Sequence, residues 1–234
     1  MPVDLRGVRT VLLPGTGSDD DYVRRAFGPA LRSVGAVLVA PAPEPGTLIA
    51  GYRRALDDAA AVGPVAVGGV SLGAAVALAW ALEHPDCAVA VLAALPAWSG
   101  DPREAPGAAT ARLSAHQLRS DGLAAATALM QQSSPAWLAD ELTRSWAGLW
   151  PALPDAMEEA AGYVAPTRAE LTRLRTPLAV ASASDDPVHP LHVGVEWVEN
   201  APTAALRTVT LAQIGADPSA LGAACVAALR ELSG

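Results

Sequence analysis

The sequence predicts an α/β protein with a mostly parallel, doubly wound sheet and one inserted, all-helical segment. Short runs rich in valine, leucine and alanine alternate with segments of helical length, and continuous apolar runs are typical of parallel strands buried on both faces. The alternation stops once, between residues 97 and 165, where helical patterns occur without a strand-like run. We therefore predict a first core part at 1–96, a helical cap at 97–165 and a second core part at 166–234.

Strands and helices alternate regularly before the cap. The predicted strands are 8–13, 36–40, 65–67 and 87–95, and the predicted helices are 19–33, 47–62 and 72–82. Ser18 is the expected N-cap of the first helix, with Asp21 three residues later, as in a capping box.

The cap contains predicted helices at 108–119, 122–132, 135–149 and 155–164. Tryptophans at 98, 137, 146 and 150 also fall in this segment. Such side chains either line a pocket or pack the cap onto the core, since pockets and cores use the same apolar residues. Trp98, Trp137 and Trp146 are our candidates for substrate contact.

The sheet pattern resumes after the cap. A helix is predicted at 167–175, where Thr167 and Glu170 form a capping box. Strands at 178–183 and 205–211 and helices at 191–200 and 216–232 follow.

The strongest functional signal is Gly69-Val70-Ser71-Leu72-Gly73, which lies between a buried strand and an Ala- and Leu-rich helix. A serine on such a tight strand-to-helix turn is held in strained geometry with its hydroxyl exposed. The flanking glycines fit where a Cβ would meet the crossing strand and helix. Ser71 is therefore the candidate nucleophile.

Together with the cap and the segment Asp186-Pro187-Val188-His189-Pro190, this elbow resembles the α/β-hydrolase family, in a compact form that starts at the family's third strand. The resemblance spans the whole chain and implies a Ser71 nucleophile. It matches Asp186 to the acid of the family's Asp-x-x-x-Pro loop, with Asp185 as the alternative acid and a simple Asp-capped turn as the alternative interpretation. It also implies an oxyanion hole from the backbone N–H groups of Leu72 and Thr16, and Val188 is a candidate substrate contact.

One position departs from the family. The family's histidine follows the last strand, where this chain has Gly215-Ala216, and a serine without a base is a poor nucleophile. His84, His116 and His192 are expected to be structural or exposed. His189 lies three residues after Asp186, so a turn could let Asp186 hold it and present its other nitrogen to Ser71. The alternative is that His189 only lines the pocket or caps the turn at Pro190.

The charge and the cysteine content of the chain limit the kinds of partner and compartment that we expect. A net charge of -8 and a pI of about 4.9 argue against nucleic acid and anionic membranes. Cys87 and Cys225 lie in apolar patterns and are expected to be reduced thiols of a cytoplasmic protein, and the N-terminus lacks the apolar region of a signal peptide. The acidic run Asp19–Asp21 fits a helix N-terminus, and we expect no metal and no cofactor. The expected partner is a small-molecule substrate; the sequence does not determine the oligomeric state, for which a homodimer is one candidate.

These features predict a serine hydrolase acting on a small or medium carboxylic ester or thioester. Because Ala216 replaces the usual histidine, two alternatives stay open: a non-catalytic small-molecule binder on a hydrolase scaffold, and cofactor-free, lyase-like chemistry on the same fold.

Overall fold

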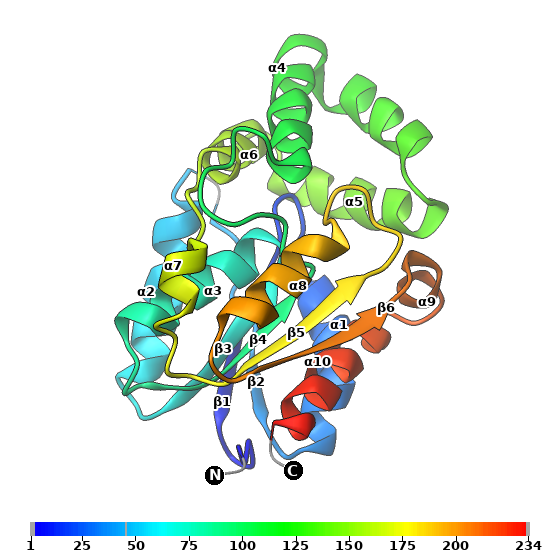
Figure 1. Cartoon of the computed structure of the whole chain (residues 1–234). Coiled ribbons are helices and arrows are strands. Elements are labelled where there is room, and N and C mark those ends of the chain that lie inside the picture. The colour runs from blue at the N-terminus through cyan, green and yellow to red at the C-terminus, as the bar shows by residue number, and fades with distance from the viewer. Residues whose placement is uncertain (1–2, 45, 233–234) are drawn as a thin grey trace.

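The computed structural model describes residues 3–44 and 46–232. Within them, six parallel strands form one sheet in the order β2-β1-β3-β4-β5-β6 (Figure 1). The strands are β1 (Arg9–Leu13), β2 (Val37–Val39), β3 (Val65–Val70), β4 (Ala88–Ala94), β5 (Leu178–Ala183) and β6 (Ala204–Val209). The predicted α/β class with a parallel sheet is confirmed.

Helices cover both faces of this sheet. They are α1 (Asp20–Ser33), α2 (Leu48–Ala60), α3 (Leu72–Glu83), α7 (Arg168–Leu171), α8 (Leu191–Asn200), α9 (Leu211–Ala216) and α10 (Ser219–Glu231). Helices α1 and α10 pack on one face and α2, α3 and α8 on the other (Figure 1). All six residues of β3 are buried, and its side chains alternate between the two resulting cores. The strand that carries the elbow is thus fixed from both sides.

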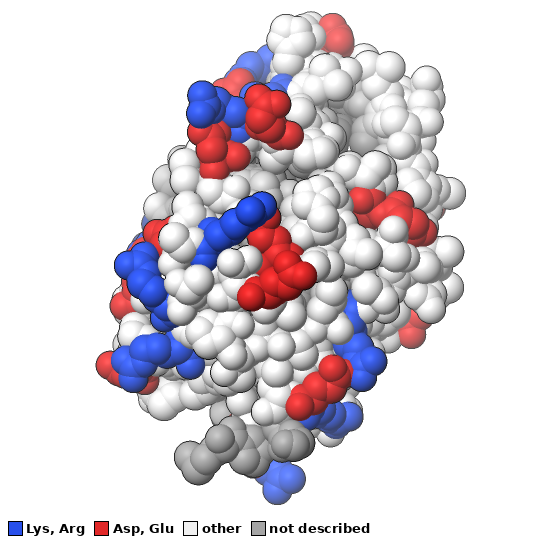
Figure 2. Space-filling model, viewed as in Figure 1, with Lys and Arg blue, Asp and Glu red and all other residues white. Residues whose placement is uncertain are grey.

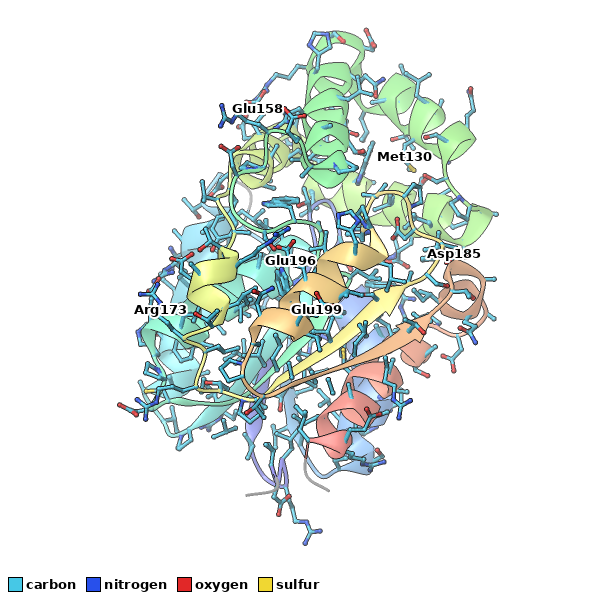
Figure 3. The ribbon with its side chains drawn as sticks, viewed as in Figure 1. Met130, Glu158, Arg173, Asp185, Glu196 and Glu199 are labelled. Carbon is cyan, nitrogen blue, oxygen red and sulfur yellow. The ribbon has the colours of Figure 1, made fainter. Side chains whose placement is uncertain are left out.

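The helical insertion lies between β4 and β5, and we call its helices α4 (Pro106–Ser133), α5 (Ala136–Leu149) and α6 (Leu153–Ala161) the cap. The cap stands over the carboxyl ends of the strands (Figure 1). Helix α4 bends at Gly122, whose φ of 80° and ψ of 172° are not helical, which is where the sequence predicts two separate helices. The cap has a core of its own that includes Met130, Trp146 and Met157, and Figure 3 shows Met130 between the arms of α4 and α5.

Three local predictions are wrong. The helix predicted at 167–175 is the short α7, which ends at Leu171. Asp19, not Ser18, is the N-cap of α1, because its carboxylate accepts the hydrogen bond of the Tyr22 N–H, whereas the Ser18 N–H donates to the Gly15 carbonyl in a preceding turn. The segment after β6 forms the short helix α9 before α10 starts. A capping box between Thr210 and Gln213 nucleates this helix.

Neither cysteine forms a disulfide: both thiols are free, and Cys225 is buried. Burial raises the pKa of the Cys225 thiol to about 12, so this side chain behaves as an apolar core residue. None of the described helices combines the length and apolar character that crossing a membrane requires.

A carboxylate of the cap binds the start of a core helix. The N-terminus of α2 has no side-chain cap of its own. Instead, the Leu48 N–H donates to Glu159 Oε2 at 2.9 Å and the Ile49 N–H donates to Oε1 at 3.0 Å. This contact satisfies two helix N–H groups and places negative charge at the positive end of the helix dipole. Glu159 thereby ties α6 to α2.

We expect Glu159→Gln to lower the free energy of unfolding by about 1 kcal/mol, because the amide replaces one acceptor oxygen with a donor that faces a backbone N–H. Urea denaturation would measure the change. Glu158→Gln is the matched control, since Glu158 is an exposed neighbour paired with Arg119, and its loss should cost less than about 0.5 kcal/mol. Equal effects of the two substitutions would show that the contact with α2 adds nothing.

Candidate active site

Ser71 occupies a strained turn between β3 and α3. Its φ of 55° and ψ of -117° lie in a region that non-glycine residues rarely adopt. A Cβ at Gly69 or at Gly73 would come within 2.4 Å of the Leu13 carbonyl oxygen, so only glycine lets β1 and α3 approach the turn so closely. A strand, a tight turn at Ser71 and a helix are the elements that the predicted nucleophile elbow requires.

The Ser71 hydroxyl is not used as a helix cap. Serine at an N-cap normally accepts a hydrogen bond from the first turn of the helix, but Ser71 makes no such side-chain bond. Its Oγ lies 3.0 Å from His189 Nε2. The elbow therefore directs the hydroxyl toward the imidazole and away from its own helix.

His189 is held from its other side by Asp186. Nδ1 of His189 lies 2.7 Å from Asp186 Oδ2, and the two side chains are 18% and 8% exposed. An ionised carboxylate only accepts hydrogen bonds, so Nδ1 carries the proton and Nε2 presents a lone pair to the Ser71 hydroxyl. Serine, histidine and aspartate thus form a continuous chain of hydrogen bonds.

Asp186 is kept ionised by its surroundings. Burial acts to raise the pKa of this carboxyl. The hydrogen bond from His189, the positive charge of that ring when it is protonated, and the backbone N–H groups of Val188 and His189 together outweigh burial. The pKa therefore lies below its ordinary value. A group held in this way suits the role of orienting an imidazole and stabilising its protonated form.

The loop after β5 brings the two side chains together through its own backbone. Asp186 Oδ1 accepts the Val188 N–H at 2.8 Å and the His189 N–H at 3.2 Å, which is an Asx turn. This turn folds residue 189 back so that its ring meets Oδ2 of the same carboxylate. Prolines at 187 and 190 stiffen the turn on both sides.

Asp185 has a different partner. Its Oδ1 accepts the Leu211 N–H at the start of α9, at 2.8 Å, and Figure 3 shows it on the far side of the loop, next to α9. Of the two adjacent acids, the structure brings Asp186 to His189 and Asp185 to α9. The contact between Asp185 and Leu211 could not be predicted from the sequence, because α9 itself was not predicted.

The other candidate histidines lie elsewhere. His84 stacks on Trp80 and its Nδ1 lies 2.9 Å from the Trp80 carbonyl oxygen, while His116 and His192 are exposed. Ala216, at the family's usual histidine position, is the exposed last residue of α9. His189 is thus the histidine that reaches Ser71.

The segment 14–18, which we call the oxyanion loop, packs against the elbow. A Cβ on Gly15 would lie 3.5 Å from the Ser71 Cβ and 3.3 Å from the Val70 carbonyl oxygen. Thr16 is half-buried in this loop and Leu72 is the buried first residue of α3. The N–H of a first helical residue has no partner within its helix. Leu72 thus lies next to Ser71 in the chain, and Thr16 follows Gly15, the loop residue that packs against Ser71.

The candidate substrate contacts are spread over the cap boundary. Trp98 donates its indole N–H to the Tyr163 carbonyl at 3.1 Å and lines a groove of about 650 Å³ that also includes Pro190, the residue after His189. Trp137 packs against Gly215, Trp146 lies in the cap core, and Val188 bonds Asp186 through its N–H. These side chains meet neighbouring elements, and they do not converge on Ser71 as one group.

A cluster of carboxylates gathers at the contact between cap and core. Oxygens of Asp19, Asp21 and Glu141 lie within 4.8 Å of one another. Arg144 forms ion pairs with all three, and Arg25 pairs with Asp21 and Glu141. The positive charge that this cluster requires is therefore supplied by arginine.

The charge on the face of the molecule seen in Figure 2 is uneven. Acidic side chains gather over α8, where Figure 3 places Glu196 and Glu199, with arginine beside them, and Arg168 pairs with Glu196. The second arm of α4, from Gly122 to Ser133, carries no charged residue.

Comparison with solved structures identifies the fold. A hydrolase from Pseudomonas aeruginosa shares 22% identity over 95% of this chain and 90% of its own, with a TM-score of 0.70. A structure from a study of carboxylesterases of Nitrososphaera gargenis shares 17% identity over 89% and 83%, with a TM-score of 0.71. The enol-lactonase from Burkholderia xenovorans shares 17% sequence identity over 88% of this chain and 83% of its own, with a TM-score of 0.67.

No protein-family profile matches the sequence, and no curated protein matches it. The likeness thus lies in the backbone and at low sequence identity, and it confirms what the elbow and the loop after β5 led us to expect of the architecture. The chain has the α/β-hydrolase fold.

Proposed function

We propose that this protein is a serine hydrolase that cleaves a small or medium carboxylic ester or thioester. The observation that carries the proposal is the hydrogen-bonded chain from Ser71 Oγ through His189 to Asp186. It supplies the base that the sequence lacks at Ala216. Catalytic triads are defined by geometry and role, and their order along the chain varies between folds.

In the proposed reaction, Ser71 Oγ attacks the substrate carbonyl while its proton passes to His189 Nε2. Asp186 accepts the Nδ1 hydrogen bond throughout and stabilises the imidazolium. The N–H groups of Leu72 and Thr16 bind the oxyanion of the tetrahedral intermediate. Collapse of this intermediate breaks the bond to the alcohol or thiol, which takes the proton from His189. Water then attacks the acyl-enzyme with His189 as base, releasing the carboxylic acid and restoring Ser71.

Two observations support an ester-type substrate. Solved structures of the same fold include one from a study of carboxylesterases and an enol-lactonase, both names that denote acyl–oxygen chemistry. The second arm of α4 is uncharged. Trp98 lines a groove beside Pro190 whose lining also includes Asp101, Glu104, Arg168 and Glu196 but not Ser71 or His189. We keep Trp98 and Val188 as proposed substrate contacts.

Incubation with a fluorophosphonate followed by intact-mass spectrometry should give a single adduct on the wild type. Ser71→Ala should give none, and His189→Ala should react at least about a thousandfold more slowly, because the hydroxyl then lacks its base. His116→Ala is the control, since His116 is an exposed residue of α4. It should react like the wild type.

The other outcomes of the labelling experiment distinguish the proposed hydrolase from the alternative functions. Equal labelling of His189→Ala and the wild type would remove His189 from the mechanism. An unlabelled wild type that is stabilised thermally by small esters without turnover would favour the non-catalytic binder or lyase-like chemistry.

A comparison of two neighbouring acids tests which of them serves the imidazole. Asp186→Asn should lower kcat on the order of 10⁴-fold, since a neutral amide favours the wrong histidine tautomer. Asp185→Asn keeps an acceptor for the Leu211 N–H and should stay within a few-fold of the wild type. Steady-state kinetics on an activated ester such as p-nitrophenyl butyrate would measure both. A larger loss in Asp185→Asn than in Asp186→Asn would reverse the assignment.

The lowered pKa of Asp186 also predicts a pH-dependent stability. A folded state that depresses a carboxyl pKa is stabilised above the unfolded value of about 4, and this stabilisation is lost as the pH falls through the folded pKa. The difference in free energy of unfolding between the wild type and Asp186→Asn should therefore be larger at about pH 7 than at about pH 2. Urea denaturation across this range would measure it. A difference that stays constant with pH would refute the lowered pKa.

A further inference from the structure

Three consecutive residues of α5, Arg144, Ser145 and Trp146, contact the oxyanion loop or Asp19, the residue that follows it. The Ser145 hydroxyl donates a hydrogen bond to the Gly17 carbonyl at 2.6 Å, and Ser145 is 1% exposed. This bond joins residues 128 positions apart in the chain. A buried hydroxyl that reaches a loop carbonyl in this way fixes the peptide to which the carbonyl belongs.

The next residue closes the space around the same position. Gly17 has a φ of +72°, and a Cβ there would lie 2.8 Å from Trp146 Nε1 and 3.2 Å from Met157 Cε. The indole of Trp146 and the end of Met157 therefore rest directly on the backbone of the loop. Position 17 therefore requires glycine for two reasons: its positive φ, and the lack of space for a Cβ beside Trp146 and Met157.

The residue before Ser145 binds Asp19, which directly follows the oxyanion loop. Arg144 Nη1 and Nη2 lie 2.6 and 2.9 Å from the two oxygens of Asp19, and Asp19 also caps α1. Burial acts to raise the pKa of Asp19, but the bonds from Arg144 and from the Tyr22 N–H hold it below its ordinary value. The forked ion pair is of the kind in which arginine fixes geometry as well as charge.

Thr16, whose N–H is the proposed oxyanion donor, directly precedes the gripped residue Gly17. Oxyanion stabilisation requires donors held at hydrogen-bond distance from a point in space, and small displacements are costly in rate. We infer that Ser145 and Arg144 are positioning residues that hold the oxyanion loop in place, so that docking of the cap onto the core is a condition for rapid acylation of Ser71. This inference rests on the proposed hydrolase function.

The test compares Ser145→Ala and Arg144→Ala with two matched controls. Ser133→Ala removes a hydroxyl that bonds only carbonyls of its own helix. Arg119→Ala removes an arginine of nearly equal exposure, 42% against 44%, whose acidic partners Asp155 and Glu158 lie within the cap. Hydrolysis of p-nitrophenyl butyrate, the rate of fluorophosphonate labelling and the thermal midpoint would be measured for each.

Ser145→Ala should lower kcat and the labelling rate about 10- to 100-fold, less than the 10²- to 10³-fold effect of deleting a donor outright, because the donor is misplaced and not removed. KM should change less than about threefold and the pH profile should keep its shape, since His189 and Asp186 are untouched. Both controls should stay within about twofold of the wild type. Arg144→Ala should lower the labelling rate by a smaller factor, and Arg144→Lys should restore only part of it because lysine cannot form the fork.

Ionic strength gives a readout that a purely structural role would not move. Salt screens the pair of Arg144 and Asp19, in which the arginine is half-exposed and the aspartate is mostly buried. Labelling of the wild type should therefore slow with added salt, whereas labelling of Arg144→Ala should not. The inference is overturned if folded Ser145→Ala reacts like Ser133→Ala, or if salt slows both proteins equally. A wild type that is neither labelled nor active would overturn the proposed function and this inference with it, whereas an active wild type with unaffected variants would overturn the inference alone.

Discussion

The arrangement of the candidate site depends on how one carboxylate divides its two oxygens. Oδ1 of Asp186 binds the backbone of its own loop and Oδ2 binds the imidazole of His189. The first set of bonds creates the turn that makes the second bond possible. The same bonds, with the positive charge of His189 when its ring is protonated, outweigh the effect of burial on the pKa of Asp186. Local folding and the orientation of the base thus have one cause.

The sheet provides the second constraint, which is the close packing of β1 against β3 and α3. Because there is no space for a side chain at Gly69 or Gly73, the turn at Ser71 is held in a conformation that a free peptide would leave. The strain is supported by a strand buried on both faces. The cap adds a third support from above, since α5 contacts the oxyanion loop and α6 contacts the start of α2.

The features that were predictable from the sequence are those with a local cause. Apolar runs predicted the strands, and the glycines around Ser71 predicted the tight turn. The structure shows the close contacts of Gly69 and Gly73 with Leu13 of β1. The spacing of three residues between Asp186 and His189 predicted that a short turn could bring the two side chains together. Contacts over long chain distances had no such signal: nothing in Arg144-Ser145-Trp146 indicates that it meets the oxyanion loop, and Asp185 could not be paired with a helix that was not anticipated. The tryptophans were ambiguous for the same reason, since their direction is set by tertiary packing.

The loop after β5 has a consequence for how such a site can change. In this chain the candidate acid and base lie three residues apart in one short segment, so a single deletion would remove both and a single graft would carry both. A site whose acid and base come from separate loops can lose one and keep the other, which leaves a partly working intermediate. Here one segment carries the pair, and the start of α9 meets this loop through the Leu211 N–H, which donates to Asp185.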